Sequence, residues 1–174
     1  TMAFSASEAF SVSVWWKTVD GEAGTLLAKK SANAPHSGVS LGISSSDNDQ
    51  VKGTLGLVLA VKETGPMLEY LYVRSKDTYD DDMWHHALVV YPGTAEAKDV
   101  RIFVDGDEIA LDVVADTLEM MSNIDPAMPP DKVLPLRLGR LGKDKDMGER
   151  SPYKGLLDDA ALWDYLTSLD QGSR

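Results

Sequence analysis

Apolar and polar residues alternate along most of the chain, which predicts β-strands rather than helices. In residues 10–17 (FSVSVWWK), four apolar side chains from Phe10 to Trp16 fall on one face of an extended strand. The same pattern predicts strands at residues 25–30, 39–44, 54–61, 67–75, 84–91, 100–104, 108–111, 136–139 and 153–163. Almost no segment has the 3.6-residue period of an amphipathic helix.

Turn residues separate these segments at short intervals. Asp105-Gly106 is the strongest hairpin signal, because this pair favours a tight two-residue turn. Residues 114–135 break the strand rhythm and predict a long irregular insertion with one short helical turn near 118–121, and only the tail 168–172 resembles a helix start. We therefore predict an all-β fold, a two-sheet antiparallel sandwich, in a single domain spanning residues 1–174.

Three segments together resemble the laminin-G-like, concanavalin-A-type family. Residues 10–17 are similar to its opening strand "FTISAWVK", and residues 84–91 (WHHALVVY) with 100–106 (VRIFVDG) resemble "WHHVAVTYDG…VRLYVDG". Residues 153–163 (YKGLLDDAALW) resemble "FKGxIDDVRIYN". The resemblance implies a jelly-roll sandwich over residues 10–171. It does not specify a function, because the family has lectin-like, adhesive and architectural members.

Charge and composition narrow the classes of partner. The chain carries 28 acidic and 17 basic residues, a net charge of −11, and its longest basic run is Lys29-Lys30. Binding to nucleic acid is disfavoured, since a phosphate backbone needs a basic patch. No apolar run approaches the length that membrane insertion requires. The absence of cysteine removes disulfides, zinc–thiolate sites and thiol nucleophiles.

The catalytic patterns known on this fold are missing from the sequence. Some relatives hydrolyse β-glucans with a carboxylate pair in an E-x-D-x-x-E arrangement, and no glutamate here has partners at those spacings. His85 and His86 point to opposite faces of a strand, so they are unsuited to one metal ion and are interpreted as structural. We predict that the chain is not an enzyme and has no catalytic residues.

The candidate ligand-binding residues are Tyr70, Tyr72 and Arg74, which share one face of a predicted strand. Tyrosine rings stack on the C–H faces of sugars, and arginine donates hydrogen bonds to hydroxyl groups. The alternative is that the tyrosines cap the core with wet hydroxyls. Trp15 matches a recurrent tryptophan of the family and is expected to be structural.

The candidate metal ligands are Asp158 and Asp159. The apolar residues around them do not alternate strictly, which implies a β-bulge that aims one carboxylate at an ion. One structural calcium ion would fit an oxygen-rich site of this kind. The acidic loops 47–49 and 144–149 lack the full calcium-loop pattern. The alternative is that both aspartates are only solvated.

The leading hypothesis is a non-catalytic recognition or adhesion module, with carbohydrate as the first expected ligand, within an extracellular or periplasmic bacterial protein. Its binding face would be the concave sheet or the loops 45–53, 93–98 and 115–135. The second hypothesis is an architectural or protein-docking domain that uses the Met-rich loop 120–128, because methionine adapts to irregular partners. A degenerate glycosidase is the third.

Overall fold

The computed structural model describes residues 5–18, 22–30, 37–45, 51–60, 69–120, 135–144, 148–150 and 152–166. Regular structure in these ranges is β-strand, apart from one helical turn, η1 (Ala97–Asp99). None of the described residues belongs to a helix that is long and apolar enough to cross a membrane.

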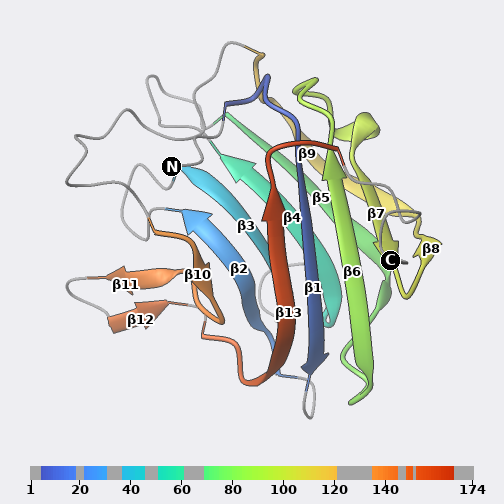
Figure 1. Cartoon of the computed structure of the whole chain (residues 1–174), viewed down its shortest axis with the longest axis vertical. Helices are drawn as coiled ribbons and strands as arrows, with labels where there is room; N and C mark the ends of the chain where they lie inside the picture. Colours follow the sequence, from blue (N-terminus) through green and yellow to red (C-terminus); the bar gives the residue numbers. More distant parts are fainter. Residues whose placement is uncertain are drawn as a thin grey trace.

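The first sheet has five strands. Its order is β13 (Gly155–Trp163), β1 (Phe10–Thr18), β6 (Trp84–Tyr91), β7 (Arg101–Val104) and β8 (Asp107–Glu108). All of the pairings are antiparallel, and β7 and β8 form the hairpin that Asp105-Gly106 predicts. In Figure 1 this sheet faces the viewer, with β13 at one edge.

The second sheet has six strands. Its order is β10 (Arg137–Leu138), β2 (Gly24–Lys30), β3 (Gly38–Ile43), β4 (Thr54–Ala60), β5 (Tyr70–Thr78) and β9 (Leu111–Asp116). A separate hairpin, β11 (Gly142–Asp144) with β12 (Gly148–Arg150), lies beyond β10 in Figure 1.

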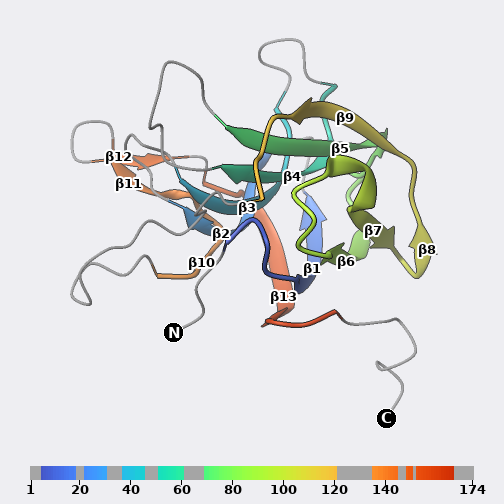
Figure 2. The ribbon, with the colours of Figure 1, turned by 90° about the horizontal axis from the view of Figure 1, so that it is seen from above.

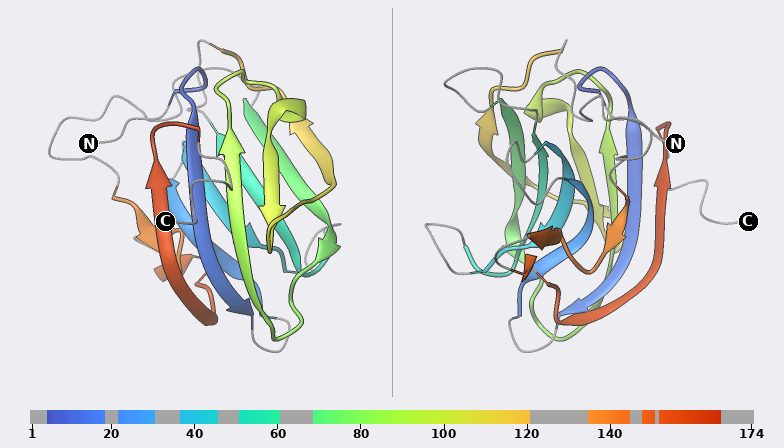
Figure 3. Two further views of the ribbon diagram at one scale, coloured as in Figure 1. Left: turned by 45° about the vertical axis from the view of Figure 1, so that its right-hand side comes forward. Right: turned by 90° about the vertical axis from the view of Figure 1, so that its left-hand side faces the viewer.

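The two sheets pack face to face, and the core fills the space between them. Figure 2 shows them as two layers, and the right-hand view of Figure 3 looks along the space that the core occupies. The inward residues of β1, from Phe10 to Trp16, are no more than 1% exposed. Alternate residues of β3, β4, β5 and β6 complete the same apolar cluster. The alternation seen in the sequence is therefore the alternation between core and solvent.

The predicted two-sheet antiparallel sandwich is confirmed, and the differences lie at its margins. The expected helical turn is wrong for residues 118–120, which form no helix. The Thr117 N–H donates to the Tyr70 carbonyl at 3.0 Å, and Leu118 is buried in the core, so this segment continues along the sheet. Strand β9 also occupies part of the predicted insertion. The predicted helix start at 168–172 lies outside the described residues.

Candidate functional site

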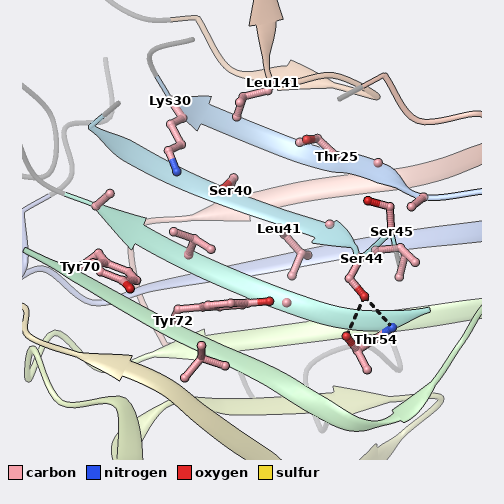
Figure 4. A pocket seen from close by; sticks show the side chains of 18 residues that line it. Thr25, Lys30, Ser40, Leu41, Ser44, Ser45, Thr54, Tyr70, Tyr72 and Leu141 are labelled. Atoms are coloured by element: carbon pink, nitrogen blue, oxygen red, sulfur yellow. Dashed lines mark hydrogen bonds between the residues drawn. The ribbon is translucent and has the colours of Figure 1, made fainter. Parts of the chain in front are cut away.

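A groove of about 690 Å³ lies on the outer face of the six-stranded sheet. Strand alternation creates its floor: leucines of β4 point into the core, while Gly56 and Val58 point outward. On the neighbouring strand β3, Ser40 and Gly42 also point outward. Short side chains therefore occupy the middle of this sheet face (Figure 4), and the sheet is hollowed there.

Tyr72 forms one wall of the groove, and glycine makes room for it. A Cβ added at Gly56 would lie 3.0 Å from the Cε2 atom and 3.5 Å from the hydroxyl of Tyr72. The ring therefore crosses β4 at the one position of that strand where no side chain opposes it. Burial raises the pKa of Tyr72, and the nearby charge of Arg74 offsets this in part. The phenol thus keeps its proton at neutral pH and can both donate and accept hydrogen bonds.

The structure places two of the three predicted ligand residues in the groove. Tyr70 and Tyr72 both line it, and both are half-buried. Arg74 projects from the same face of β5 but is not part of the lining, because it turns toward β9. Its Nε atom lies 3.8 Å from a carboxylate oxygen of Asp112, its cross-strand neighbour. Arg74 therefore stands beside the groove, with its charge directed at Asp112.

Hydroxyl groups surround the rest of the groove. The Ser44 hydroxyl donates to the Val51 carbonyl at 2.6 Å, and the Thr54 hydroxyl, 2.8 Å from Ser44 Oγ and 2.9 Å from the same carbonyl, donates to one of these two oxygens. Thr25 and Ser40 add two more hydroxyls along β2 and β3. Polar groups of this kind suit a ligand that is itself rich in hydroxyls.

Lys30 is the charged residue of the groove lining among the described residues. A register shift in β2 between Thr25 and Leu27 changes the phase of the strand. Lys30 consequently projects from the groove face, whereas Lys29 is 5% exposed on the other side. Burial lowers the pKa of Lys30.

Sequence reasoning found the two tyrosines but missed Lys30 and the glycines. Alternation in residues 39–43 (VSLGI) and 54–59 (TLGLVL) does place Ser40, Gly42 and Gly56 outward, and it could have indicated a hollowed face. Lys30 could not be found in this way, because the shift in β2 breaks the alternation.

Asp158 and Asp159 lie on β13, an edge strand of the five-stranded sheet, and not with the tyrosines. The predicted bulge is confirmed: Ser13 pairs with Ala161 while Trp15 pairs with Asp158. Asp159 takes the left-handed conformation, with φ of 42°, and its N–H donates to Asp158 Oδ1 at 2.9 Å. Both carboxylates are exposed.

No group of three His, Cys, Asp or Glu residues that could hold a metal ion occurs in the described part of the chain. Residues 47–49 of the first acidic loop lie outside that part, and the side chains of the second, at 144–149, are not described. Calcium at Asp158 and Asp159 therefore stays a prediction from the sequence.

The two histidines point to opposite faces, as the alternation of β6 predicts. His86 lies outside, with Nε2 2.6 Å from the Ser13 hydroxyl, and its ring packs against Trp15 at an interplanar angle of 39°, with the centroids 5.0 Å apart. His85 lies inside, between two carboxylates: Nδ1 is 2.7 Å from Asp105 and Nε2 is 3.0 Å from Asp81. These contacts fix the start of β6 to the β7–β8 turn.

The His85 contacts predict a pH-dependent stability. Burial lowers the pKa of His85, but its bonds to Asp105 and Asp81 outweigh this and leave it above 6.5. The bond to His85 lowers the pKa of Asp81 below 3.8. The contribution of His85 to folding stability is fully present below pH 6.5 and is lost as pH rises through the pKa of His85 in the folded state. The contribution of Asp81 to folding stability is lost as pH falls through the pKa of Asp81 in the folded state.

We expect the stability difference between the parent chain and His85→Gln to be largest between pH 3.8 and 6.5 and to shrink above that range. Urea unfolding at a series of pH values measures it. His86→Gln is the matched control, because burial lowers the pKa of His86 and no such loss should appear as pH rises. If the stability difference between the parent chain and His85→Gln does not change above pH 6.5, the interpretation that Asp105 and Asp81 hold a charged His85 is wrong.

The outer face of the five-stranded sheet carries a second feature, a set of exposed apolar side chains. Trp15, Trp84 and Leu156 are 39%, 43% and 52% exposed, and they come from neighbouring positions of β1, β6 and β13. Trp15 is therefore not a core residue, although its ring packs against His86. The tryptophan with the core role is Trp16.

Comparison with solved structures places this fold among known sandwiches. Over 95% of this chain and 81% of the other, it is similar to the CBM40 domain of the Ruminococcus gnavus IT-sialidase, with 15% identity and a TM-score of 0.55. The same domain bound to α2,3-sialyllactose gives a TM-score of 0.56 at 14% identity, over 94% and 80% of the two chains.

Laminin and pentraxin domains are similar as well. Domains LG4-5 of the mouse laminin α1 chain match at 14% identity and a TM-score of 0.50, over 96% of this chain and 40% of theirs. The SAP-like pentraxin of Limulus polyphemus gives 15% identity and a TM-score of 0.50, over 97% and 71%. A search of curated protein sequences found no match. The family model for the concanavalin A-like lectin/glucanases superfamily matches residues 2–171, and the chain belongs to that family.

Proposed function

We propose that this chain is a non-catalytic carbohydrate-binding module and that it binds its ligand in the groove of the six-stranded sheet. The observation that carries the proposal is the lining: Tyr70 and Tyr72 beside a hollowed floor of small residues, with hydroxyl groups around it. Aromatic rings pack on the C–H faces of a pyranose, and hydroxyls exchange hydrogen bonds with its equatorial groups. The volume of about 690 Å³ lies in the range of small-ligand sites.

The comparisons support the same class of function. The CBM40 domain, similar over most of this chain, has been solved with sialyllactose bound. The family includes lectins as well as glucanases. We propose further that the module works outside the cytoplasm, because its fold is similar to that of a laminin domain and of a sialyllactose-binding domain. The alternative of protein docking through the Met-rich loop falls on residues that are largely not described, although Met120 is 55% exposed.

The test is a glycan array probed with the purified chain, first with calcium and then with chelator. We expect binding to a subset of glycans, and we expect the double variant Tyr70→Ala/Tyr72→Ala to weaken it by about tenfold or more, since each aromatic contact contributes about 0.5–1.5 kcal/mol. Tyr165→Ala is the matched control, because that tyrosine is 51% exposed and not part of the groove lining.

Two outcomes of this array decide on carbohydrate binding and on calcium. If no glycan binds in either condition, the proposed function is wrong. If binding and the melting temperature both depend on calcium, and Asp158→Asn removes that dependence, the sequence prediction of calcium at Asp158 and Asp159 is supported.

A further inference from the structure

The groove carries a positive charge in a strongly acidic protein. The chain has a net charge of −11, yet the described residues that line the groove include Lys30 and no aspartate or glutamate. The charge of the described lining is therefore opposite in sign to the net charge of the molecule. The field in a cleft is set by its nearest charges, because low-dielectric walls focus it.

Lys30 also differs from most lysines of the described residues, which have a carboxylate beside them. Five lysines of the described residues form ion pairs with aspartate or glutamate: Lys17, Lys52, Lys76, Lys98 and Lys154. Within the same described ranges, no carboxylate pairs with Lys30. An ammonium group that is partly removed from water without a counter-charge is destabilised. An anion bound in the groove would supply the missing counter-charge and so stabilise the ammonium group.

The strand register aligns Lys30 with a tyrosine across the sheet. Lys30 pairs with Gly38 on β3, Gly38 with Ala60 on β4, and Ala60 with Tyr70 on β5. Gly38 and Ala60 are small, so no long side chain of these strands stands between the ammonium and the ring. Three strand spacings give a backbone separation of about 14 Å. Figure 4 shows the Lys30 side chain extending from β2 over β3, on the side where Tyr70 lies.

We propose that the ligand of this groove is an acidic glycan, whose anionic group binds the Lys30 ammonium while a sugar ring packs against the tyrosines. This assignment rests on the proposed carbohydrate function and adds the charge of the ligand to it. A carboxylate of a sialic or uronic acid and a sulfate ester share the chemistry that Lys30 recognises. They are distinguished as separate arms of the experiment.

The experiment measures dissociation constants by calorimetry for pairs of glycans that differ only in the anionic group. The pairs are lactose with 3′-sialyllactose, a neutral oligosaccharide with its glucuronate-terminated form, and an unsulfated with a 6-sulfated disaccharide. We expect the parent chain to prefer the acidic member of at least one pair by about tenfold or more, as a hydrogen bond to a charged group gives. The preference should weaken as salt increases.

Three variants test whether the positive charge of Lys30 causes the preference for the acidic glycan. Lys30→Met keeps the apolar stem and should remove the preference, so that the variant binds the acidic glycan and its neutral partner with equal affinity. Lys30→Arg should keep the preference, because it keeps the charge. Lys98→Met is the matched control: it removes the same charge from an exposed lysine that is not part of the groove lining.

The outcomes separate this inference from the proposed function. Equal affinity for neutral and acidic members in every pair, or a preference that persists in Lys30→Met, overturns the role of Lys30 and leaves carbohydrate binding standing. Failure to bind any glycan, neutral or acidic, overturns the proposed function and this inference with it.

Discussion

Replacing Gly56 by leucine is expected to abolish carbohydrate binding while leaving the fold intact. The Tyr72 ring lies where a side chain at this position would stand, since even a Cβ atom would come within 3.0 Å of it. A leucine must therefore displace the ring and fill the middle of the groove. Gly56 points away from the core, so the substitution should change the free energy of unfolding by less than about 1 kcal/mol. Calorimetry with a glycan that binds the parent chain should show a loss of more than about tenfold.

A matched control adds the same bulk elsewhere. Ala161 lies on β13 and pairs with Ser13, whose side chain faces outward from the five-stranded sheet, so Ala161→Leu enlarges a residue on the opposite side of the molecule. It should leave binding unchanged. If the Gly56→Leu variant is folded and still binds the glycan with the affinity of the parent chain, the ligand does not occupy the groove.

The largest loss of stability is expected for Trp16→Ala, at about 3–5 kcal/mol. Trp16 is fully buried between the sheets, and its ring contacts Tyr79 and His85, with centroids 6.2 and 5.4 Å away. The alanine variant leaves a cavity that neighbouring strands of a close-packed sandwich cannot fill. Urea unfolding measures the change.

Two further variants show that the loss comes from the cavity. Trp16 Nε1 is buried with no hydrogen-bond partner among the described residues, so Trp16→Phe removes an unsatisfied donor and should cost much less than alanine. Trp15→Ala, at a position 39% exposed, should cost less than half as much as Trp16→Ala. Similar losses for Trp15→Ala and Trp16→Ala would contradict the assignment of the two faces of β1.

How well a strand of this fold can be predicted from the sequence depends on whether the strand is central in its sheet or lies at an edge. Strand β1 has a fully buried face, and its alternation therefore marks both the strand and the core. Strand β9 lies at an edge, and its Val113 and Val114 are both about half exposed, so no apolar alternation identifies it. The hairpin of β11 and β12 pairs only with itself, and its sequence carries little apolar signal.

The candidate site was harder to predict because it depends on cross-strand neighbours. Tyr70 and Tyr72 could be recognised as one face of a strand, but the order of the strands decides what lies beside them. Arg74 fits the same spacing, yet its cross-strand neighbour Asp112 draws it aside. Lys30 faces the groove only because of an irregularity in β2. A single sequence contains no signal for either contact.

The most direct test of the central claim is an NMR titration of the isotope-labelled chain with a glycan selected from the array. We expect the largest shifts at backbone amides of β3, β4 and β5 around Ser40, Gly56 and Tyr72, which line the groove. Shifts that instead cluster around Trp15 and His86, on the outer face of the five-stranded sheet, would contradict this claim.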